Sequence, residues 1–189
     1  GTKILNKVPL SAIFPQDQNN KPEFDIIRDY NNLSVACQEL GDTDKAEEYI
    51  HKACEILSLM PASETEKYEH TETLYNSLGL VHHRKGELDT AIEYYLRAIY
   101  HIIRKYGDEE NKYLATTYCN IGMAFFEKGD TEEALSYLHK SEKIFRNLNS
   151  TDIFYIYNYL SEIYTQKGDT EKAEYYQNLI KRNARFILN

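Results

Sequence analysis

The sequence contains no tryptophan and only three cysteines, four prolines and eight glycines in 189 residues. The cysteines form no CxxC pair and no Cys/His ligand spacing, which argues against a disulfide framework and a zinc site. Such a sparse, odd set of thiols fits a reducing compartment, so we expect a cytoplasmic protein. Few helix-breaking residues and an apolar content of 42% make disorder a poor interpretation.

The sequence also lacks long apolar runs and any excess of positive charge. No apolar run approaches 18 residues and no signal peptide is present, so no membrane contact is expected. The formal net charge of −8 argues against nucleic acid or an anionic membrane as the main partner, because both need a basic surface.

Motifs that carry chemistry are missing as well. There is no phosphate-cradling glycine-rich loop, no HExxH and no GxSxG. The neighbouring His82 and His83 cannot chelate one ion from one helix face, because adjacent helical residues point about 100° apart. We therefore predict no catalytic, metal or cofactor site, and a protein that is not an enzyme.

What the sequence does contain is an internal repeat, which is the feature to seek first. Four segments align without gaps on a shared glycine, and successive glycines lie 45, 43 and 39 residues apart. The segments are 30–53, 75–98, 118–141 and 157–180, with Gly41, Gly86, Gly129 and Gly168 as their glycines.

The positions around the glycine predict two helices joined by a tight turn. The positions eleven, eight, seven and four residues before it have recurring residue types. The later three follow the first by three, four and seven residues, which is typical of one packed helix stripe. The residue seven before it is small and the fifth residue after it is always alanine, so two helix axes can approach closely. The small residues are Ser34, Gly79, Gly122 and Ser161, and the alanines are Ala46, Ala91, Ala134 and Ala173.

The turn residues supply helix caps in this interpretation. The glycine provides a left-handed cap for the first helix. The Gly-Asp-Thr that follows in three repeats provides an N-cap for the second helix, and Glu133 stands in capping-box spacing from Asp130.

This pattern resembles the tetratricopeptide repeat signature over roughly residues 23–185. Leu78, Gly79, Gly86, Ala91, Tyr95 and Ala98 match nearly the whole of it. The resemblance implies an all-α fold, a right-handed superhelical solenoid of about four antiparallel helix hairpins. The usual period is about 34 residues, so extra helical turns or longer linkers must absorb the difference. Longer repeats of this kind resemble those of kinesin light chains and Rap-type peptide receptors.

The resemblance also predicts the domain organisation. Residues 22–189 form the repeat array, with hairpins at about 23–60, 64–106, 109–148 and 150–188. Residues 1–21 fall outside the pattern and form an N-terminal extension, either a helix docked on the first repeat or a strap lying in the groove.

In this family the first helix of each repeat lines a concave groove, which implies where a ligand binds. Asparagine recurs ten residues before the glycine, although it is an indifferent helix former. Its amide offers a donor and an acceptor to the backbone of an extended peptide, or it bonds between adjacent helices; both interpretations stay open. The predicted groove residues are Asn31, Asn76, Asn158, Asn120, Arg28, His83, Arg84, Met123, Phe126 and Tyr155.

The function predicted from these features is a non-catalytic module that holds a protein or an extended peptide in the groove. One alternative is the sensor domain of a signalling protein that binds a short peptide. A second is a structural scaffold in which the repeats assemble into a homo-oligomer.

Overall fold

The computed structural model describes residues 23–61, 70–107 and 111–187, with side chains up to residue 182. The regular structure in these ranges is helical throughout and contains no strand, which confirms the all-α class. The chain divides into two units, residues 1–70 and 71–189, and each is considered on its own. The predicted extension 1–21 lies outside the described residues.

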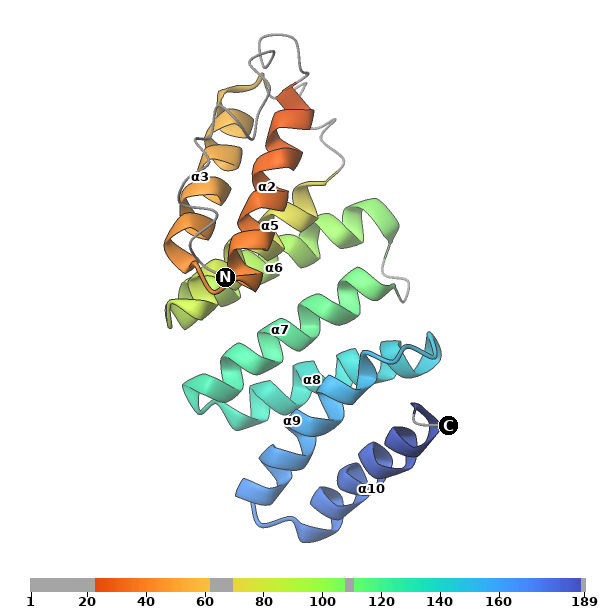
Figure 1. Cartoon of the computed structure of the whole chain (residues 1–189). Coiled ribbons are helices and arrows are strands. Elements are labelled where there is room, and N and C mark those ends of the chain that lie inside the picture. Colours follow the sequence, from red (N-terminus) through yellow and green to blue (C-terminus); the bar gives the residue numbers. More distant parts are fainter. Residues whose placement is uncertain (1–22, 62–69, 108–110, 188–189) are drawn as a thin grey trace. The chain divides into compact units, whose positions relative to one another are not determined.

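In the described part of the first unit, α2 (Glu23–Glu39) and α3 (Thr43–Leu59) form a helical hairpin. The two helices pack along their length (Figure 1). Ile27 of α2 and Ala46, Ile50 and Ala53 of α3 are fully buried. The rings of Tyr30 and Tyr49 stack at 6.1 Å between centroids.

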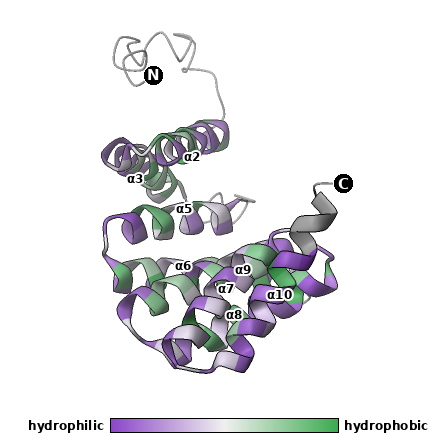
Figure 2. Cartoon of the chain, turned by 60° about the horizontal axis from the view of Figure 1, so that its bottom comes forward, coloured by the Kyte–Doolittle hydropathy of each residue, from purple (hydrophilic) through white to green (hydrophobic). Residues whose placement is uncertain are grey.

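The second unit contains three further hairpins. They are formed by α5 (Thr71–Arg84) with α6 (Leu88–Tyr106), α7 (Lys112–Lys128) with α8 (Thr131–Asn147), and α9 (Ile153–Gln166) with α10 (Thr170–Ile187). Consecutive hairpins are joined by contacts of α6 with α7 and of α8 with α9. Polar and apolar residues alternate around these helices in the manner of amphipathic packing (Figure 2).

The turn inside each hairpin has the same hydrogen bonds. At Gly129 the backbone is left-handed, with φ of 87°, and its N–H donates to the Phe126 carbonyl at 3.0 Å. The N–H of Asp130 donates to the Phe125 carbonyl at 2.9 Å, which completes a Schellman motif. The predicted left-handed glycine cap is therefore confirmed, and it lets the chain reverse direction within a few residues.

The predicted aspartate caps are confirmed at two turns. Asp42 Oδ1 accepts from the Lys45 N–H at 3.2 Å, and Asp169 Oδ1 accepts from the Lys172 N–H at 3.1 Å. The prediction is wrong for Asp130, whose side chain makes no cap hydrogen bond. Its carboxylate lies 3.4 Å from Lys128 Nζ, a residue before the turn. The carboxylates of Asp42 and Asp169 instead pair with the lysine three residues ahead, whose backbone N–H they also cap.

Small residues mark the points where the two helices of a hairpin approach most closely. A Cβ added at Gly122 would lie 2.7 Å from Leu138 Cγ and 3.2 Å from the Ala134 carbonyl oxygen. A Cβ added at Gly79 would overlap the ring of Tyr95. In the first hairpin Ser34 occupies the same position, and its hydroxyl donates to the Ala46 carbonyl at 2.7 Å.

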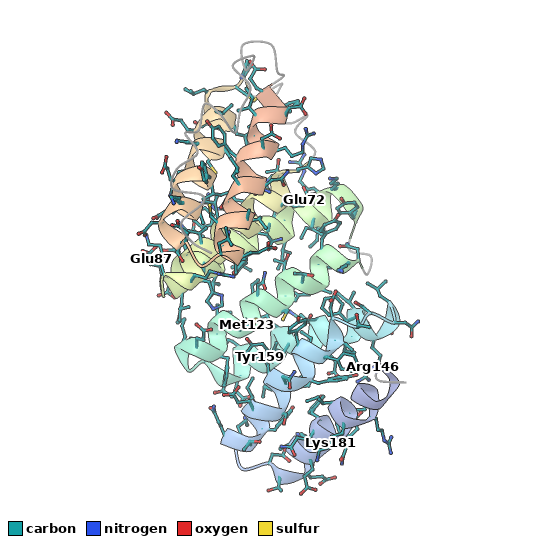
Figure 3. The ribbon with its side chains drawn as sticks, in the orientation of Figure 1. Glu72, Glu87, Met123, Arg146, Tyr159 and Lys181 are labelled. Carbon is teal, nitrogen blue, oxygen red and sulfur yellow. The ribbon has the colours of Figure 1, made fainter. Side chains whose placement is uncertain are left out.

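A different repeat position, near the start of the first helix, carries a charge in one hairpin only. Glu72 stands fourteen residues before its turn glycine, where the other repeats have Ile27, Ala115 and Phe154. Its side chain is buried, and Lys105 Nζ of α6 donates to Glu72 Oε1 at 3.0 Å (Figure 3). The pair matters because a buried carboxylate without a counter-charge is strongly destabilising.

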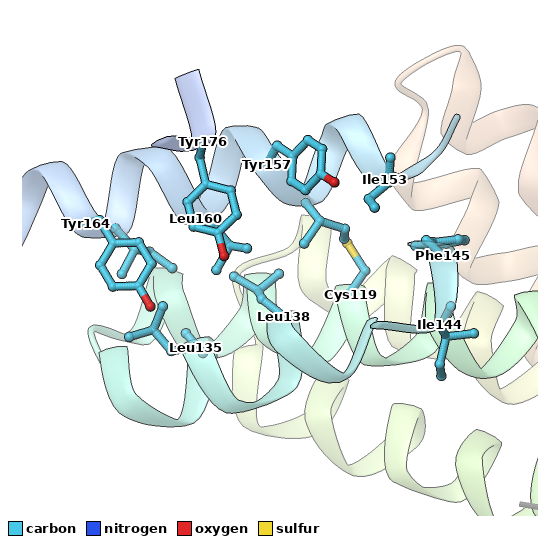
Figure 4. Close-up of a cluster of buried hydrophobic side chains, with 14 of the residues drawn as sticks. Cys119, Leu135, Leu138, Ile144, Phe145, Ile153, Tyr157, Leu160, Tyr164 and Tyr176 are labelled. Carbon is cyan, nitrogen blue, oxygen red and sulfur yellow. The ribbon is translucent and has the colours of Figure 1, made fainter. Parts of the chain in front are cut away.

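The core between the last two hairpins combines apolar packing with one buried carboxylate. Leu135 and Leu138 of α8 belong to the same buried cluster as Leu160 and Tyr164 of α9 (Figure 4). The other members of this cluster labelled in Figure 4 are Cys119, Ile144, Phe145, Ile153, Tyr157 and Tyr176.

Glu142 is the buried carboxylate of this core, and it links α8 to α10. Glu142 Oε2 accepts from the Tyr176 hydroxyl at 3.3 Å and lies 3.0 Å from His139 Nδ1. Arg146 Nη2 donates to Glu142 Oε1 at 2.5 Å. Burial, with the nearby Glu142 carboxylate, raises the pKa of Tyr176. The network joins α8 to α10 at a place where the packing is otherwise apolar.

We expect the Gly122→Ala substitution to lower the free energy of unfolding by roughly 1–2 kcal/mol. The added methyl group would force Leu138 or the helix backbone to move, an overpacking cost of about 1–3 kcal/mol that exceeds the roughly 1 kcal/mol gained in helix propensity. Urea denaturation followed by circular dichroism measures the change. Thr116→Ala, at an exposed position on the same helix, is the control and should stay within about 0.5 kcal/mol. A Gly122→Ala protein as stable as the wild type would contradict this account of the helix approach.

The cysteines should react slowly in the folded protein. Burial raises the pKa of Cys54 to about 11 and that of Cys119 to about 12. Because the thiolate is the reactive form, Cys119 at pH 8 should alkylate about a thousandfold more slowly than an unfolded thiol with a pKa of about 8.5. Iodoacetamide labelling with mass spectrometry, with and without urea, gives the ratio. Equal labelling of folded and unfolded Cys119 would show that its burial is wrong.

Candidate functional site

The first helices of the three hairpins in the second unit share one face. Helix α5 contacts α7, and α7 contacts α9, so the three lie in sequence beside one another. Their second helices pack behind them, each against its hairpin partner. The face of α5, α7 and α9 that is not used for this packing is the candidate site. Asn31 and Arg28 belong to α2 of the first unit, so they are described apart from this face. Arg28 Nη2 lies 2.7 Å from Asp25 Oδ1 of the same helix.

Asn76 forms a bridge between two of these helices. Its Nδ2 donates to Thr117 Oγ1 of α7 at 2.9 Å. The Thr117 hydroxyl lies 3.1 Å from Asn76 Oδ1 and 2.8 Å from the Tyr113 carbonyl, to which it can donate. The single hydroxyl proton serves one of these two acceptors, while the Asn76 Nδ2 bond joins α5 to α7 in either case. The contact corresponds to the interhelix interpretation of Asn76.

The other predicted asparagines have different surroundings. Asn158 is exposed on α9, and its Nδ2 donates to the Phe154 carbonyl of its own helix at 2.9 Å. Asn120 on α7 is half-buried. Asn31 on α2 is buried, and its Oδ1 has no hydrogen-bond partner among the described residues. The four amides therefore do not form a uniform ladder.

His83 is held between three helices. Its Nε2 lies 3.0 Å from Glu127 Oε1 of α7, and its Nδ1 lies 3.5 Å from the Tyr95 hydroxyl of α6. Its ring meets the Tyr95 ring edge-on at 6.4 Å between centroids. Burial raises the pKa of Tyr95, so its hydroxyl stays protonated. Arg84, the next residue, is exposed at the end of α5.

His82 points to a different partner. Its Nδ1 lies 2.5 Å from Glu87 Oε2 in the turn before α6, and its ring stacks on Tyr94 at 5.2 Å. The hydrogen bond from His82, followed by one from Lys85, lowers the pKa of Glu87. The adjacent histidines therefore serve separate contacts, and the described part of the chain holds no group of three side chains suited to a metal ion.

An apolar strip runs along α7 and reaches α9. Met123 and Phe126 are half-buried on α7, and the Phe126 ring meets the Tyr159 ring of α9 edge-on at 6.4 Å. Met123 and Tyr159 are labelled in Figure 3. The Met123 sulfur lies 3.9 Å from the Cys119 thiol, which anchors the strip to the core. Burial raises the pKa of Tyr159. We call Met123, Phe126 and Tyr159 the aromatic strip.

Exposed side chains of α9 flank the aromatic strip. Tyr155, Tyr159 and Glu162 are spaced four and three residues apart, so they lie on one side of α9. Tyr155 is 68% exposed, an unusual position for so large an aromatic ring. Together these residues offer a partner aromatic faces to pack on, beside hydrogen-bonding groups of Asn120 and Asn158.

Thr117 and Tyr159 contribute contacts to this site although they were not among the predicted groove residues. Thr117 was missed because its role depends on Asn76, a residue 41 positions earlier in the chain. Tyr159 had a sequence signal: it stands nine residues before its glycine, where the other repeats have Asn32, Ser77 and Asn120. An aromatic residue in an otherwise polar register position indicates a local specialisation.

Comparison with known proteins agrees with this architecture. The tetratricopeptide repeat family model matches residues 70–147 and again 113–185, and a second tetratricopeptide repeat model matches residues 30–56. The chain belongs to the tetratricopeptide repeat (TPR) family. The four TPR hairpins are those defined by the turn glycines, and TPR domains are in general interaction modules without catalysis.

Three solved structures show the same TPR fold. BtubC from P. vanneervenii has 24% identity and a TM-score of 0.67, with 85% of this chain and 64% of that chain covered. RapI in its apo form has 17% identity and a TM-score of 0.70, with 86% and 43% covered. A kinesin light chain protein of Podospora anserina with nearly identical TPR-like repeats has 15% identity and a TM-score of 0.68, with 85% and 75% covered.

These structural matches show the fold, and they also show how much of each longer protein this chain covers. The chain spans less than two thirds of BtubC and of RapI. Curated protein sequences gave no match. None of the described helices is long and apolar enough to cross a membrane.

The Asn76 bridge can be tested against Asn158 as its internal control. Asn76→Ala should lower the free energy of unfolding by about 1–2 kcal/mol, because it removes a half-buried interhelix bond and leaves Thr117 without this partner. Asn158→Ala should change it by less than about 0.5 kcal/mol, since that exposed amide bonds only within its own helix. Urea unfolding of both variants gives the comparison. Equal effects would mean that Asn76 does not join the repeats.

Proposed function

We propose that this TPR domain binds an extended polypeptide segment across the face of α5, α7 and α9, with the aromatic strip as its main contact. The observation that carries the proposal is the half-exposed strip of Met123, Phe126 and Tyr159, extended by the exposed ring of Tyr155. Aromatic side chains with one accessible face are enriched where proteins bind one another, because they supply large contact area at low entropic cost.

The polar groups of the site are suited to a peptide backbone rather than to a charged ligand. Asn120 and Asn158 lie beside the strip, and an amide can both donate to and accept from a main chain. On the same face Glu127 is paired with His83, while Glu162 is exposed on α9. A largely neutral or basic segment fits this arrangement better than an acidic one.

One solved structure supports a second candidate, a sensor role. It is a signal transduction ATPase from Pyrococcus horikoshii with a TPR sensor, at 22% identity and a TM-score of 0.69. The match covers 88% of this chain and 26% of that chain. A sensor would use the same face for a short peptide. Self-assembly and a cytoplasmic location stay predictions.

Peptide-array screening followed by titration of the best peptide tests the proposed face. The Tyr155→Ala/Asn158→Ala double variant should bind that peptide at least about tenfold more weakly than the wild type, a loss of about 1.4 kcal/mol. Tyr175→Ala on α10 removes a ring of comparable exposure, 51%, and should stay within about twofold. Equal losses in both variants would place the ligand elsewhere. Sedimentation of the free protein separates self-assembly from peptide binding.

A further inference from the structure

The outward side of α6 carries a row of exposed apolar side chains. Leu96, Tyr100 and Ile103 are 45%, 58% and 39% exposed. Their spacing of four and three residues places them in one stripe on the helix. None of the three belongs to the buried clusters of the unit, whereas Ile99 of the same helix packs against both of them. Tyr100 meets the ring of His101 edge-on at 5.2 Å and the Arg104 guanidinium, both on its own helix, so packing against the other described helices does not explain the composition of the stripe.

The other repeats provide an internal comparison for this stripe. Leu96, Tyr100 and Ile103 stand ten, fourteen and seventeen residues after their turn glycine. The same three positions are polar in the other described second helices, so the repeat fold itself does not require apolar residues there. They are His51, Glu55 and Ser58 in α3, and His139, Lys143 and Arg146 in α8.

A basic edge runs beside the stripe. Arg97 and Arg104 are seven residues apart and hence lie on one side of α6. Arg97 Nη2 pairs with Glu93 Oε1 at 2.6 Å. The Arg104 guanidinium lies 5.7 Å from the centre of the Tyr100 ring and forms no ion pair with a described residue. A surface with an uncompensated arginine is unusual in a chain of net charge −8.

We propose that Leu96, Tyr100 and Ile103, with Arg97 and Arg104, form a docking surface for an acidic amphipathic helix of another protein. Apolar residues spaced three and four apart in that helix would pack on the stripe, and its flanking carboxylates would pair with the two arginines. This surface is on the second helix of its hairpin and is independent of the face of α5, α7 and α9.

A second copy of this chain fits the surface less well than an acidic helix. Each copy carries a net charge of −8, so two copies repel one another at long range. Three side chains also make a small contact compared with the roughly 800 Å² per partner of a stable interface. The surface is thus suited to a transient, charge-dependent contact that adds to binding elsewhere on the partner.

Two synthetic helical peptides of about 20 residues, long enough to be helical in isolation, probe this surface. Both carry leucines spaced three and four apart; one has glutamates flanking them and the other has lysines at the same positions. Fluorescence anisotropy with the full chain should show the glutamate peptide binding at least about tenfold more tightly than the lysine peptide. The preference should shrink as salt is raised, because it depends on exposed charges.

Two variants separate the apolar and the charged contributions. Leu96→Gln/Tyr100→Gln/Ile103→Gln keeps the charge and the helix propensity and should weaken binding of the glutamate peptide at least about tenfold. Arg97→Glu/Arg104→Glu should reverse the preference in favour of the lysine peptide. Tyr175→Gln on α10 is the matched control and should leave affinity within about twofold. Circular dichroism verifies folding, and the arginine variant still tests the proposal if the glutamine variant unfolds.

Three results would overturn the proposal. They are equal affinity for the two peptides, unchanged binding by the glutamine variant, and a wild-type dimer in sedimentation that the glutamine variant abolishes. The last result would assign the stripe to a second copy of the chain.

Discussion

The close approach of two helices at a small residue is the constraint on which the rest of the structure depends. Gly122 leaves room for Leu138, and Gly79 leaves room for Tyr95. In both hairpins the backbone of the first helix therefore packs directly against a side chain of the second helix. This contact fixes how each first helix is rotated about its axis. The rotation in turn determines which residues enter the core and which remain on the face that carries the aromatic strip. A change at the small position would therefore alter the site without touching it.

Residues that act within one hairpin could be predicted from the sequence, because their partners are a few positions away. The left-handed turn glycines, the small positions and the all-α class follow from the repeat pattern and are confirmed. The predicted cap at Asp130 was wrong: its carboxylate pairs with Lys128, before the turn, whereas Asp42 and Asp169 pair with a lysine three residues ahead in the helix that they cap. The Asn76 bond and the contact of Phe126 with Tyr159 depend on the next repeat, whose register a periodic pattern does not specify.

The contacts between successive hairpins of the second unit differ in chemistry even though the repeats share a pattern. Between the second and third hairpins, Asn76 and Thr117 bond and His83 pairs with Glu127. Between the third and fourth, Glu142 is surrounded by His139, Arg146 and Tyr176. A buried polar group is costly unless its own partner is present, so each hairpin accepts its neighbour and penalises the others. Such contacts specify the order in which similar repeats stack.

The turn that closes each hairpin has a consequence for how the chain reaches its structure. The Gly129 turn joins α7 to α8 within a few residues, so their contacts connect residues of one continuous stretch, Lys112–Asn147. Loop closure then costs little entropy, and domains with such local contacts fold in microseconds to milliseconds. The same arrangement affects unfolding under force. Among the described helices of the second unit, the main contacts between hairpins are those of α6 with α7, of α8 with α9, and of the successive first helices, so a pulling force would release this unit one hairpin at a time.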